Sequence, residues 1–224
     1  MCGRYMLVAS GEELSRRFYV QEAPTIERYN AAPLQLLPAI RVQMGQSELS
    51  FLRWGLTPVW AREDFGSRLI NARAETLRER PSFRHLIHHR RCLVPASAFY
   101  EWLQHPSGRF PFRFFLPEEP LFGMAGLWDE WLNPETGELL QSFAIITVPA
   151  NGLVARIHDR MPALLHREAE KLWLDPATPV PLALSLLRPY PSEAMAFAPV
   201  SRRLNSARYD DRSLLIPEEQ PPPF

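Results

Sequence analysis

The chain has 224 residues, of which 46% are hydrophobic and 22% charged, a composition typical of a globular protein with a sizeable core. Its 25 basic and 25 acidic residues cancel, so overall charge gives no support for nucleic-acid binding, and any such surface must be local. The sequence has no apolar run near the ~20 residues that span a bilayer and no secretion-signal layout. Cys2 and Cys92 are too few for a disulfide framework. We therefore expect an intracellular, cytoplasmic protein without membrane contacts.

Arginine dominates the basic residues, since lysine occurs only at Lys171. The planar guanidinium group binds phosphate with two hydrogen bonds and stacks on bases. A local arginine surface for nucleic acid is therefore compatible with zero net charge, although scattered arginines more often form an ordinary solvated surface.

The first segment reads as a strand over residues 2–8, followed by a helix. Ser10 and Glu13 form a capping-box pattern, which predicts that this helix starts there and runs to about Tyr19. Cys2 is therefore expected at the end of a strand and held by the fold.

The next elements are short and joined by turns. In chain order we expect a loop over 20–33, a hairpin of strands 36–43 and 49–55, a loop exposing Trp60, and two short helices after residues 71–75, the second carrying His85, His88 and His89. No cysteine or acidic residue stands at ligand spacing from these histidines, so a solvated helix face is expected and no metal.

The second half of the chain is rich in strands. We expect a strand over 92–102 that buries Cys92, a turn at 105–108, a strand with Phe110, Phe112 and Phe114 on one face, a hairpin of 121–131 and 139–149, a loop over 157–162, helices near 167–173 and 181–187, and a strand over 194–200.

Most of these strands are joined by hairpins, which favours antiparallel pairing. The sequence shows neither a repeat nor a linker. We therefore predict a single α+β domain over residues 1–217, with a mainly antiparallel, barrel-like β core flanked by helices. Residues 218–224 are rich in proline and are predicted to form a frayed tail.

Cys2 follows an initiator methionine whose removal would leave a thiol and a free α-amine on neighbouring carbons. Ordinary pKa values are about 7.7 to 8.0 for the amine and about 8.5 for the thiol, so both groups are usable near neutrality. With an aldehyde, the pair can form a Schiff base and then a five-membered thiazolidine. Alternatively the thiol attacks a carbonyl with the amine as its base. The plainest interpretation is an ordinary cysteine near the start of the chain.

Three other polar residues are candidates for the same chemistry. Glu101 lies between Tyr100 and Trp102 in an apolar strand, where burial would raise its pKa and suit it to general acid or base catalysis. A strand carboxylate that faces water or pairs with an arginine is the alternative. Taken alone, His158 is typical of a structural hydrogen-bonding histidine, and Asn71 of a helix cap.

Taken together, four short blocks of the sequence resemble the signature blocks of the SOS-response-associated peptidase (SRAP) family. The blocks are MCGR (residues 1–4), NARAE (71–75), FYEW (99–102) and IHDRMP (157–162), with further agreement at 53–58, 200–201 and 204–205. The match runs from Cys2 to about Pro217 in family order and spacing. Ala98 stands where glycine is common and Leu204 where valine is common, but neither touches the chemistry.

The resemblance implies a protein that binds abasic sites in single-stranded DNA, including sites near junctions, and forms a covalent crosslink that shields the lesion. It implies that Cys2 is the nucleophile and becomes the thiazolidine on the ring-opened sugar aldehyde. Glu101 would then shuttle protons, His158 would polarise the opened sugar, and Asn71 would position Cys2 and the sugar hydroxyls. It implies no cofactor, and a monomer that is associated with the nucleoid if the protein is bacterial.

For DNA binding, the resemblance points to Arg4, Arg73 and Arg160 at the backbone or bases. Trp60 and Trp102 would stack or wedge at the lesion.

Two other functions stay open. The family name records a thiol-dependent self-processing activity, so a peptidase or amidohydrolase that uses the Cys2 thiol and α-amine is one rival, and lyase-like activity would accompany the abasic-site chemistry. A single-strand binder without chemistry is the other. Only the crosslinker predicts a denaturation-resistant adduct with abasic DNA, and only the amidohydrolase predicts amide turnover.

Overall fold

The computed structural model describes residues 2–217. Its strands are β1 (Tyr5–Ala9), β2 (Ile26–Ala31), β3 (Leu36–Gln43), β4 (Gln46–Trp54), β5 (Asn71–Arg73), β6 (Arg91–Ala96), β7 (Ala98–His105), β8 (Gly108–Phe115), β9 (Phe122–Leu132), β10 (Leu139–Pro149), β11 (Arg160–Pro162), β12 (Leu164–Leu165) and β13 (Ala196–Pro199). Its α-helices are α1 (Gly11–Phe18), α2 (Leu86–His89), α3 (Arg167–Leu174) and α4 (Val180–Ser185). Short 3-10 helices are η1 (Ala74–Thr76), η2 (Val154–Arg156), η3 (Ser192–Ala194), η4 (Arg202–Asn205) and η5 (Arg212–Leu215).

The larger sheet closes on itself. β4 pairs with β3, β3 with β6, β6 with β9 and β9 with β10, all antiparallel, and β10 returns to β4 as a parallel neighbour. The ring is a closed five-stranded barrel. Closure leaves these strands without free edges. The barrel-like, mainly antiparallel core and the single α+β domain are confirmed, and the β10–β4 contact is a parallel exception, as is the pairing of β10 with β5.

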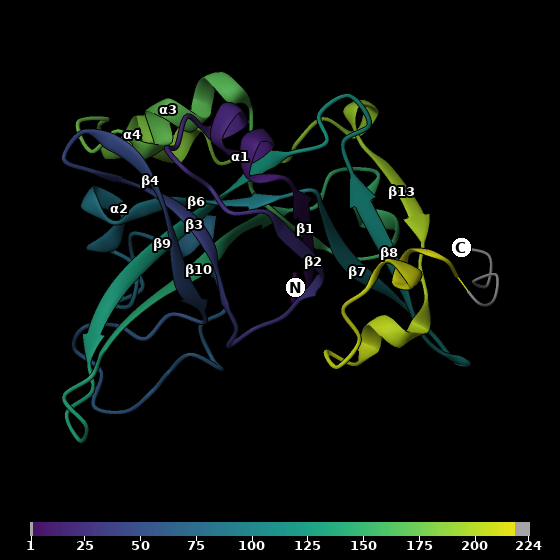
Figure 1. Cartoon of the computed structure of the whole chain (residues 1–224), viewed down its shortest axis with the longest axis horizontal. Coiled ribbons are helices and arrows are strands. Elements are labelled where there is room, and N and C mark those ends of the chain that lie inside the picture. Colours follow the sequence, from purple (N-terminus) through teal and green to yellow (C-terminus); the bar gives the residue numbers. More distant parts are fainter. Residues whose placement is uncertain (1, 218–224) are drawn as a thin grey trace.

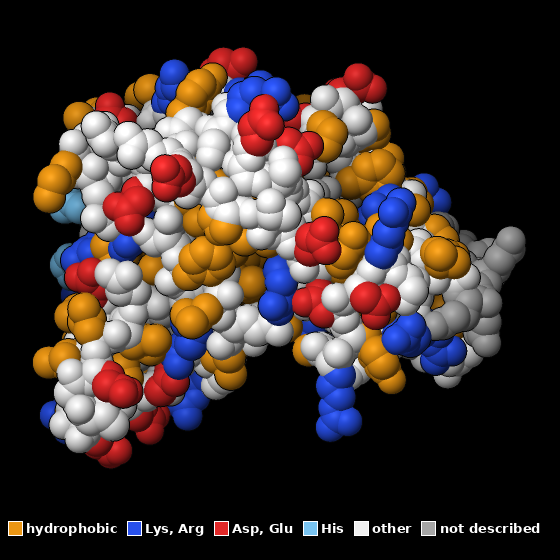
Figure 2. Space-filling view, in the orientation of Figure 1, with side chains coloured by type: hydrophobic (Ala, Val, Ile, Leu, Met, Phe, Trp, Pro, Cys, Tyr) orange, Lys and Arg blue, Asp and Glu red, His pale blue; other side chains and the backbone are white. Residues whose placement is uncertain are grey.

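A second, open sheet has the strand order β13-β8-β7-β1-β2. In Figure 1, β7, β8 and β13 stand on one side of the molecule and the barrel strands β3, β4, β9 and β10 on the other. Figure 2 shows the outline hollowed between these two sides, with acidic and basic side chains intermixed over this face. The intermixing accords with the zero net charge of the sequence.

Aromatic side chains join β1 to the barrel. The Tyr5 ring lies 5.4 Å from that of Trp54, which in turn stacks on Phe143 at 6.4 Å. All three side chains are fully buried. Because such packed aromatic pairs contribute strongly to core stability, the start of the chain, including Cys2, is fixed between the two sheets.

Helices α1 and α3 are joined by a buried ion pair. The Arg17 guanidinium bonds both carboxylate oxygens of Glu170, at 2.7 and 2.9 Å. The predicted capping box of α1 is present, with Ser10 and Glu13 bonding each other's backbone N–H groups. Two-point binding by arginine gives this pair a defined geometry.

Three predicted segments differ from the structure. Residues 26–31 form β2 instead of a loop, because β1 supplies a pairing partner that their irregular pattern does not reveal. The expected strand over 92–102 is broken at Ser97, where the Ser97 N–H bonds the Met6 carbonyl and the hydroxyl accepts from the Val8 N–H. This break lets the chain leave the barrel at β6 and enter the second sheet at β7. The end of the predicted loop over 157–162 is strand β11.

Four further expectations concern the histidines, Cys92, membrane spans and the tail. His85, His88 and His89 are exposed as predicted, and residues 2–217 contain no group of three or more histidine, cysteine or acidic side chains that suits a metal ion. Cys92 is buried in the core. No helix in the described part of the chain is long and apolar enough to cross a membrane. The predicted tail at 218–224 lies outside the described residues.

Candidate functional site

A small polar cavity opens beside the first residues of the chain. Its volume is about 220 Å³. The lining comes from the N-terminal segment, the β7–β8 hairpin, the loop before β11 and η4, and consists of Gly3, Arg4, Glu101, Trp102, Gln104, Arg109, His158 and Asn205. The cavity therefore unites four of the predicted site residues from distant parts of the sequence.

Cys2 lies immediately behind this cavity and is fully buried. The Asn71 side-chain amide donates a hydrogen bond to the Cys2 carbonyl, at 2.9 Å. Asn71 is itself fixed because β5 pairs with β10, which places it opposite Ile145. The Asn71 Oδ1 is buried and has no hydrogen-bond partner among residues 2–217. Asn71 thus holds the backbone of Cys2 and keeps one acceptor available beside it.

Burial raises the pKa of the Cys2 thiol well above its ordinary value, and the nearby Glu101 carboxylate adds to this effect. The thiol Sγ lies 3.7 Å from the Arg4 carbonyl, to which it donates. A buried thiol of this kind stays protonated at neutral pH. Any reaction at sulfur therefore needs a neighbouring group that takes the proton.

Glu101 lies in β7. Tyr100 and Trp102 belong to an apolar cluster with Met6, and Glu101 lines the cavity next to Trp102. Only 2% of its surface is exposed. Burial raises the pKa of Glu101 to about 7, while the positive charge of Arg109 opposes the rise. A carboxyl group with such a pKa exchanges protons readily at neutral pH, which is the property that its apolar setting in the sequence indicates.

His158 reaches the cavity from the loop before β11. Its Nδ1 accepts a hydrogen bond from the Arg160 backbone N–H, at 2.9 Å, and the Asp159 carboxylate lies 3.1 Å from the same nitrogen. Burial lowers the pKa of His158. The Arg160 N–H favours the neutral ring with its proton on Nε2, whereas the Asp159 carboxylate and the Arg160 carbonyl, 3.3 Å from Nδ1, favour a proton on Nδ1. With the proton on Nε2, His158 is a hydrogen-bond donor through that atom.

Two arginines give the cavity a positive wall. Arg4 and Arg109 both line it, and burial, followed by repulsion from Arg109, lowers the pKa of Arg4. The Arg109 guanidinium lies 5.5 Å from the centre of the Trp102 ring. Arg109 was not predicted from the sequence. The expected turn at 105–108 does supply a signal, because it places Arg109 opposite Gln104 on the neighbouring strand.

The other predicted DNA contacts are placed differently. Trp102 lines the cavity with its indole N–H bonded to Asn205, at 2.6 Å, whereas Arg73 and Trp60 are exposed outside the lining. Trp60 is 53% exposed. The Arg160 guanidinium is bound by the Glu75 carboxylate. The DNA roles of these residues remain predictions.

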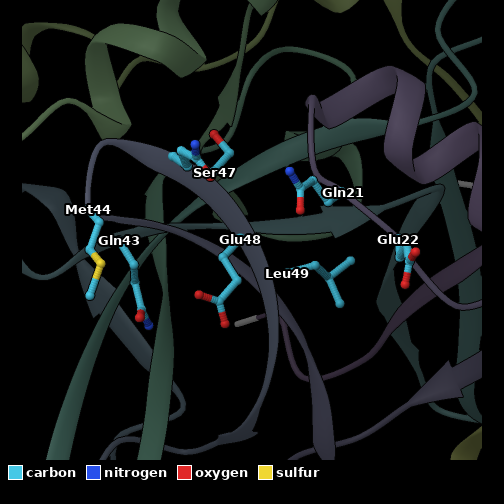
Figure 3. A pocket seen from close by; sticks show the side chains of 8 residues that line it. Gln21, Glu22, Gln43, Met44, Ser47, Glu48 and Leu49 are labelled. Atoms are coloured by element: carbon cyan, nitrogen blue, oxygen red, sulfur yellow. The ribbon is translucent and has the colours of Figure 1, made fainter.

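A larger hollow lies elsewhere, between the β3–β4 hairpin and the chain that follows α1. Its volume is about 450 Å³. Figure 3 shows its lining, which the two segments supply as Gln21, Glu22, Gln43, Met44, Gln46, Ser47, Glu48 and Leu49. This lining contains neither a thiol, an imidazole nor an arginine. The reactive groups are gathered at the smaller cavity.

Comparison with known proteins gives a consistent assignment. Residues 1–207 match the SOS response associated peptidase (SRAP) family. The chain is 40% identical over 222 residues to the abasic site processing protein YoqW of Bacillus subtilis, covering 96% of this chain and 99% of that protein. It is 38% identical over 193 residues to the abasic site processing protein HMCES of Gallus gallus, covering 75% of this chain and 57% of that protein.

A solved structure of a protein from Bacteroides thetaiotaomicron has the same fold. It superimposes with a TM-score of 0.87 at 30% identity and covers 96% of this chain and 98% of that one. Sequence and structure therefore agree over nearly the whole length. The chain belongs to the SOS response associated peptidase (SRAP) family.

Proposed function

We propose that this protein recognises abasic sites in single-stranded DNA and traps them as a thiazolidine on Cys2 after Met1 has been removed. The names of YoqW and HMCES support abasic-site processing. The observation that carries the proposal is a combination of two features near Cys2. Asn71 donates a hydrogen bond to the Cys2 carbonyl, at 2.9 Å, and burial raises the pKa of Glu101 to about 7. This places a proton-exchanging group beside an N-terminal aminothiol.

The reaction is a condensation that releases one water. The α-amine of Cys2 adds to the aldehyde of the ring-opened sugar, and loss of water gives a Schiff base. The thiol then adds to the imine carbon, and its proton passes to the imine nitrogen, which becomes the ring amine. Glu101 gives and takes protons in these steps, because both of its protonation states are populated near pH 7.

Asn71 and His158 orient the reactants. The unpartnered Asn71 Oδ1 accepts a hydrogen bond from the Cys2 amine or a sugar hydroxyl. The Nε2–H of His158 donates to the oxygen of the opened sugar, which increases the electrophilicity of the aldehyde carbon. Holding the aldehyde in the cavity next to the amine and thiol of Cys2 replaces encounters in solution by a local reaction.

Arg4 and Arg109 bind the phosphates that flank the lesion, and Trp102 forms an apolar wall for the extruded sugar. Arg73 and Trp60, which are exposed, contact the DNA farther out. A positive cavity on a protein of zero net charge restricts strong binding to this face. All of these groups belong to one chain, so a monomer suffices.

The test is the intact mass of the protein after incubation with a single-stranded oligonucleotide that carries one abasic site. We expect a species equal to the protein without Met1 plus the oligonucleotide minus one water, stable on a denaturing gel. An oligonucleotide with an ordinary base at that position is the control. Release of cleaved peptide or amide without an adduct would establish the amidohydrolase instead. Binding without either product would leave a single-strand binder.

A further inference from the structure

A two-point ion pair joins the segments that carry Asn71 and His158. Arg160 of β11 bonds Glu75 of η1 through Nη1 to Oε1, at 2.5 Å, and through Nη2 to Oε2, at 2.9 Å. Most surface ion pairs contribute little to stability, but a two-point arginine–carboxylate pair has a defined geometry. The Arg160 side chain is only 11% exposed, which reduces screening by solvent.

The same guanidinium also hydrogen-bonds to β10, the strand between the two segments. Arg160 Nη2 donates to the Thr147 carbonyl at 2.7 Å and lies 3.2 Å from the Thr147 hydroxyl. On one side Thr147 of β10 faces Arg73 of β5, and on the other it faces Pro162 of β11. The pair therefore fixes β5 and β11 to one point on β10.

This attachment sets the position of two residues of the proposed site. Asn71 starts β5 and so lies four residues before Glu75. The backbone N–H of Arg160 is the donor to His158 Nδ1, at 2.9 Å. A shift of Arg160 would move this donor and change the orientation of the imidazole that lines the cavity.

We propose that Glu75 is a positioning residue, which acts through Arg160 to hold His158 and Asn71 in place for the reaction at Cys2. The inference rests on the proposed function. It assigns Arg160 first to the protein, because Nη1 bonds Glu75 and Nη2 has three acceptor atoms within hydrogen-bond distance. Of the remaining donors, Nε is buried, so a phosphate does not reach it without a rearrangement.

Removal of Glu75 distinguishes this role from a DNA contact, because the two roles predict different changes in DNA affinity and reaction rate. If Arg160 serves the phosphates and Glu75 merely occupies it, Glu75→Ala frees a cation and strengthens binding. If Glu75 positions the site, Glu75→Ala leaves binding almost unchanged and slows the reaction of bound DNA. Misplacement of a reacting group by about 1 Å can reduce a rate by about 100-fold, so we expect a loss of about 10- to 100-fold.

The experiment measures the single-turnover crosslinking rate at saturating abasic oligonucleotide and, separately, the affinity for the matched undamaged oligonucleotide. Glu75→Ala, Glu75→Gln and Glu79→Ala are compared with the wild type. Glu79 is exposed and lines the same outer hollow as Glu75, so its removal changes the charge equally without touching Arg160. Glu75→Gln retains one acceptor and should fall between the wild type and Glu75→Ala, and it replaces Glu75→Ala if that variant does not fold.

A second readout is independent of DNA. Long-range proton–nitrogen NMR spectra of the histidine rings report which nitrogen of His158 carries the proton, with His158→Gln used to assign the signal. We expect the Nε2–H form in the wild type and Glu79→Ala, and a mixture in Glu75→Ala. A wild-type rate and spectrum in Glu75→Ala, or tighter binding with an unchanged rate, would overturn the inference. If the wild type forms no adduct, the proposed function fails and the spectra alone decide the positioning role.

Discussion

The cavity beside Cys2 is smaller than the hollow at the β3–β4 hairpin, but it holds more groups that can take part in chemistry. The first has about 220 Å³ and holds two arginines, an imidazole and a buried carboxyl group of pKa about 7. The second has about 450 Å³ and is lined mainly by amides, short polar groups and exposed carboxylates. A carboxylate in water keeps its ordinary pKa, whereas burial changes it. Buried titratable groups, and not volume, distinguish the candidate site from this hollow.

The largest expected effect comes from replacing the carboxyl group in one cavity but not in the other. Glu101→Gln keeps the shape and removes the titratable proton, so crosslinking should slow by roughly 10² to 10⁴ if Glu101 is the general acid or base. DNA binding should survive. Glu48→Gln in the larger hollow is the matched control and should react like the wild type. Equal crosslinking rates for Glu101→Gln and the wild type would remove Glu101 from the mechanism.

Glu101→Gln and Glu48→Gln also test the comparison through the pH dependence of the unfolding free energy. The pKa of Glu101 is about 7 in the folded protein and near 4.5 ordinarily, so between these values the folded state binds the extra proton. The contribution of Glu101 to stability therefore falls as pH rises from about 4.5 to about 7, by roughly 3 kcal/mol at about 1.36 kcal/mol for each pKa unit.

Chemical denaturation at pH 4.5 and pH 8 measures this term. The difference in unfolding free energy between Glu101→Gln and the wild type should shift in favour of the variant at the higher pH. Glu48→Gln should show no such shift. A difference for Glu101→Gln that is constant with pH would mean that the carboxyl group has an ordinary pKa.

A smaller effect is expected from the positive wall. Binding to single-stranded DNA weakens with salt by a log–log slope of about 0.7 for each phosphate contact. Arg109→Ala should lower the affinity, and it should lower the slope by about 0.7, the value for one phosphate contact. Arg73→Ala should change both in the same direction if Arg73 contacts the DNA. Fluorescence anisotropy over a salt series checks both. An unchanged slope in Arg109→Ala would show that the cavity does not bind phosphate.

The apolar neighbours of Glu101 are a local signal, and they predicted the burial that the structure shows for this residue. The resemblance, and not a local pattern, grouped Asn71 and His158 with it as candidates, and the roles of all three stay predictions. The hydrogen bond from Asn71 to Cys2 joins positions 69 residues apart, so no local pattern reveals it. The ion pair between Arg160 and Glu75 spans 85 residues and was not predicted for the same reason. The DNA contact of Arg160 was expected from the resemblance and stays a prediction.

The fold shows the same division between local and distant causes. The capping box at Ser10 and the hairpins are local and were predicted. The strand at 26–31 depends on its partner β1, and the break at Ser97 depends on hydrogen bonds to Met6 and Val8. Contacts between distant segments determine both the strand and the break, and neither composition nor periodicity alone reveals such contacts.

The central claim is that the free aminothiol of Cys2, and not its thiol alone, reacts with the lesion. The decisive measurement compares the wild type, Cys2→Ala and a fusion with extra residues before Cys2, each incubated with one abasic oligonucleotide and analysed on a denaturing gel, with mass spectrometry of every N-terminus. Cys2→Ala lacks the sulfur that closes the ring and should give no lasting adduct, although borohydride should trap its Schiff base. The fusion keeps the thiol but converts the amine to an amide, which is not nucleophilic, so it should also fail. Full crosslinking by a fusion verified as uncleaved would contradict the thiazolidine mechanism.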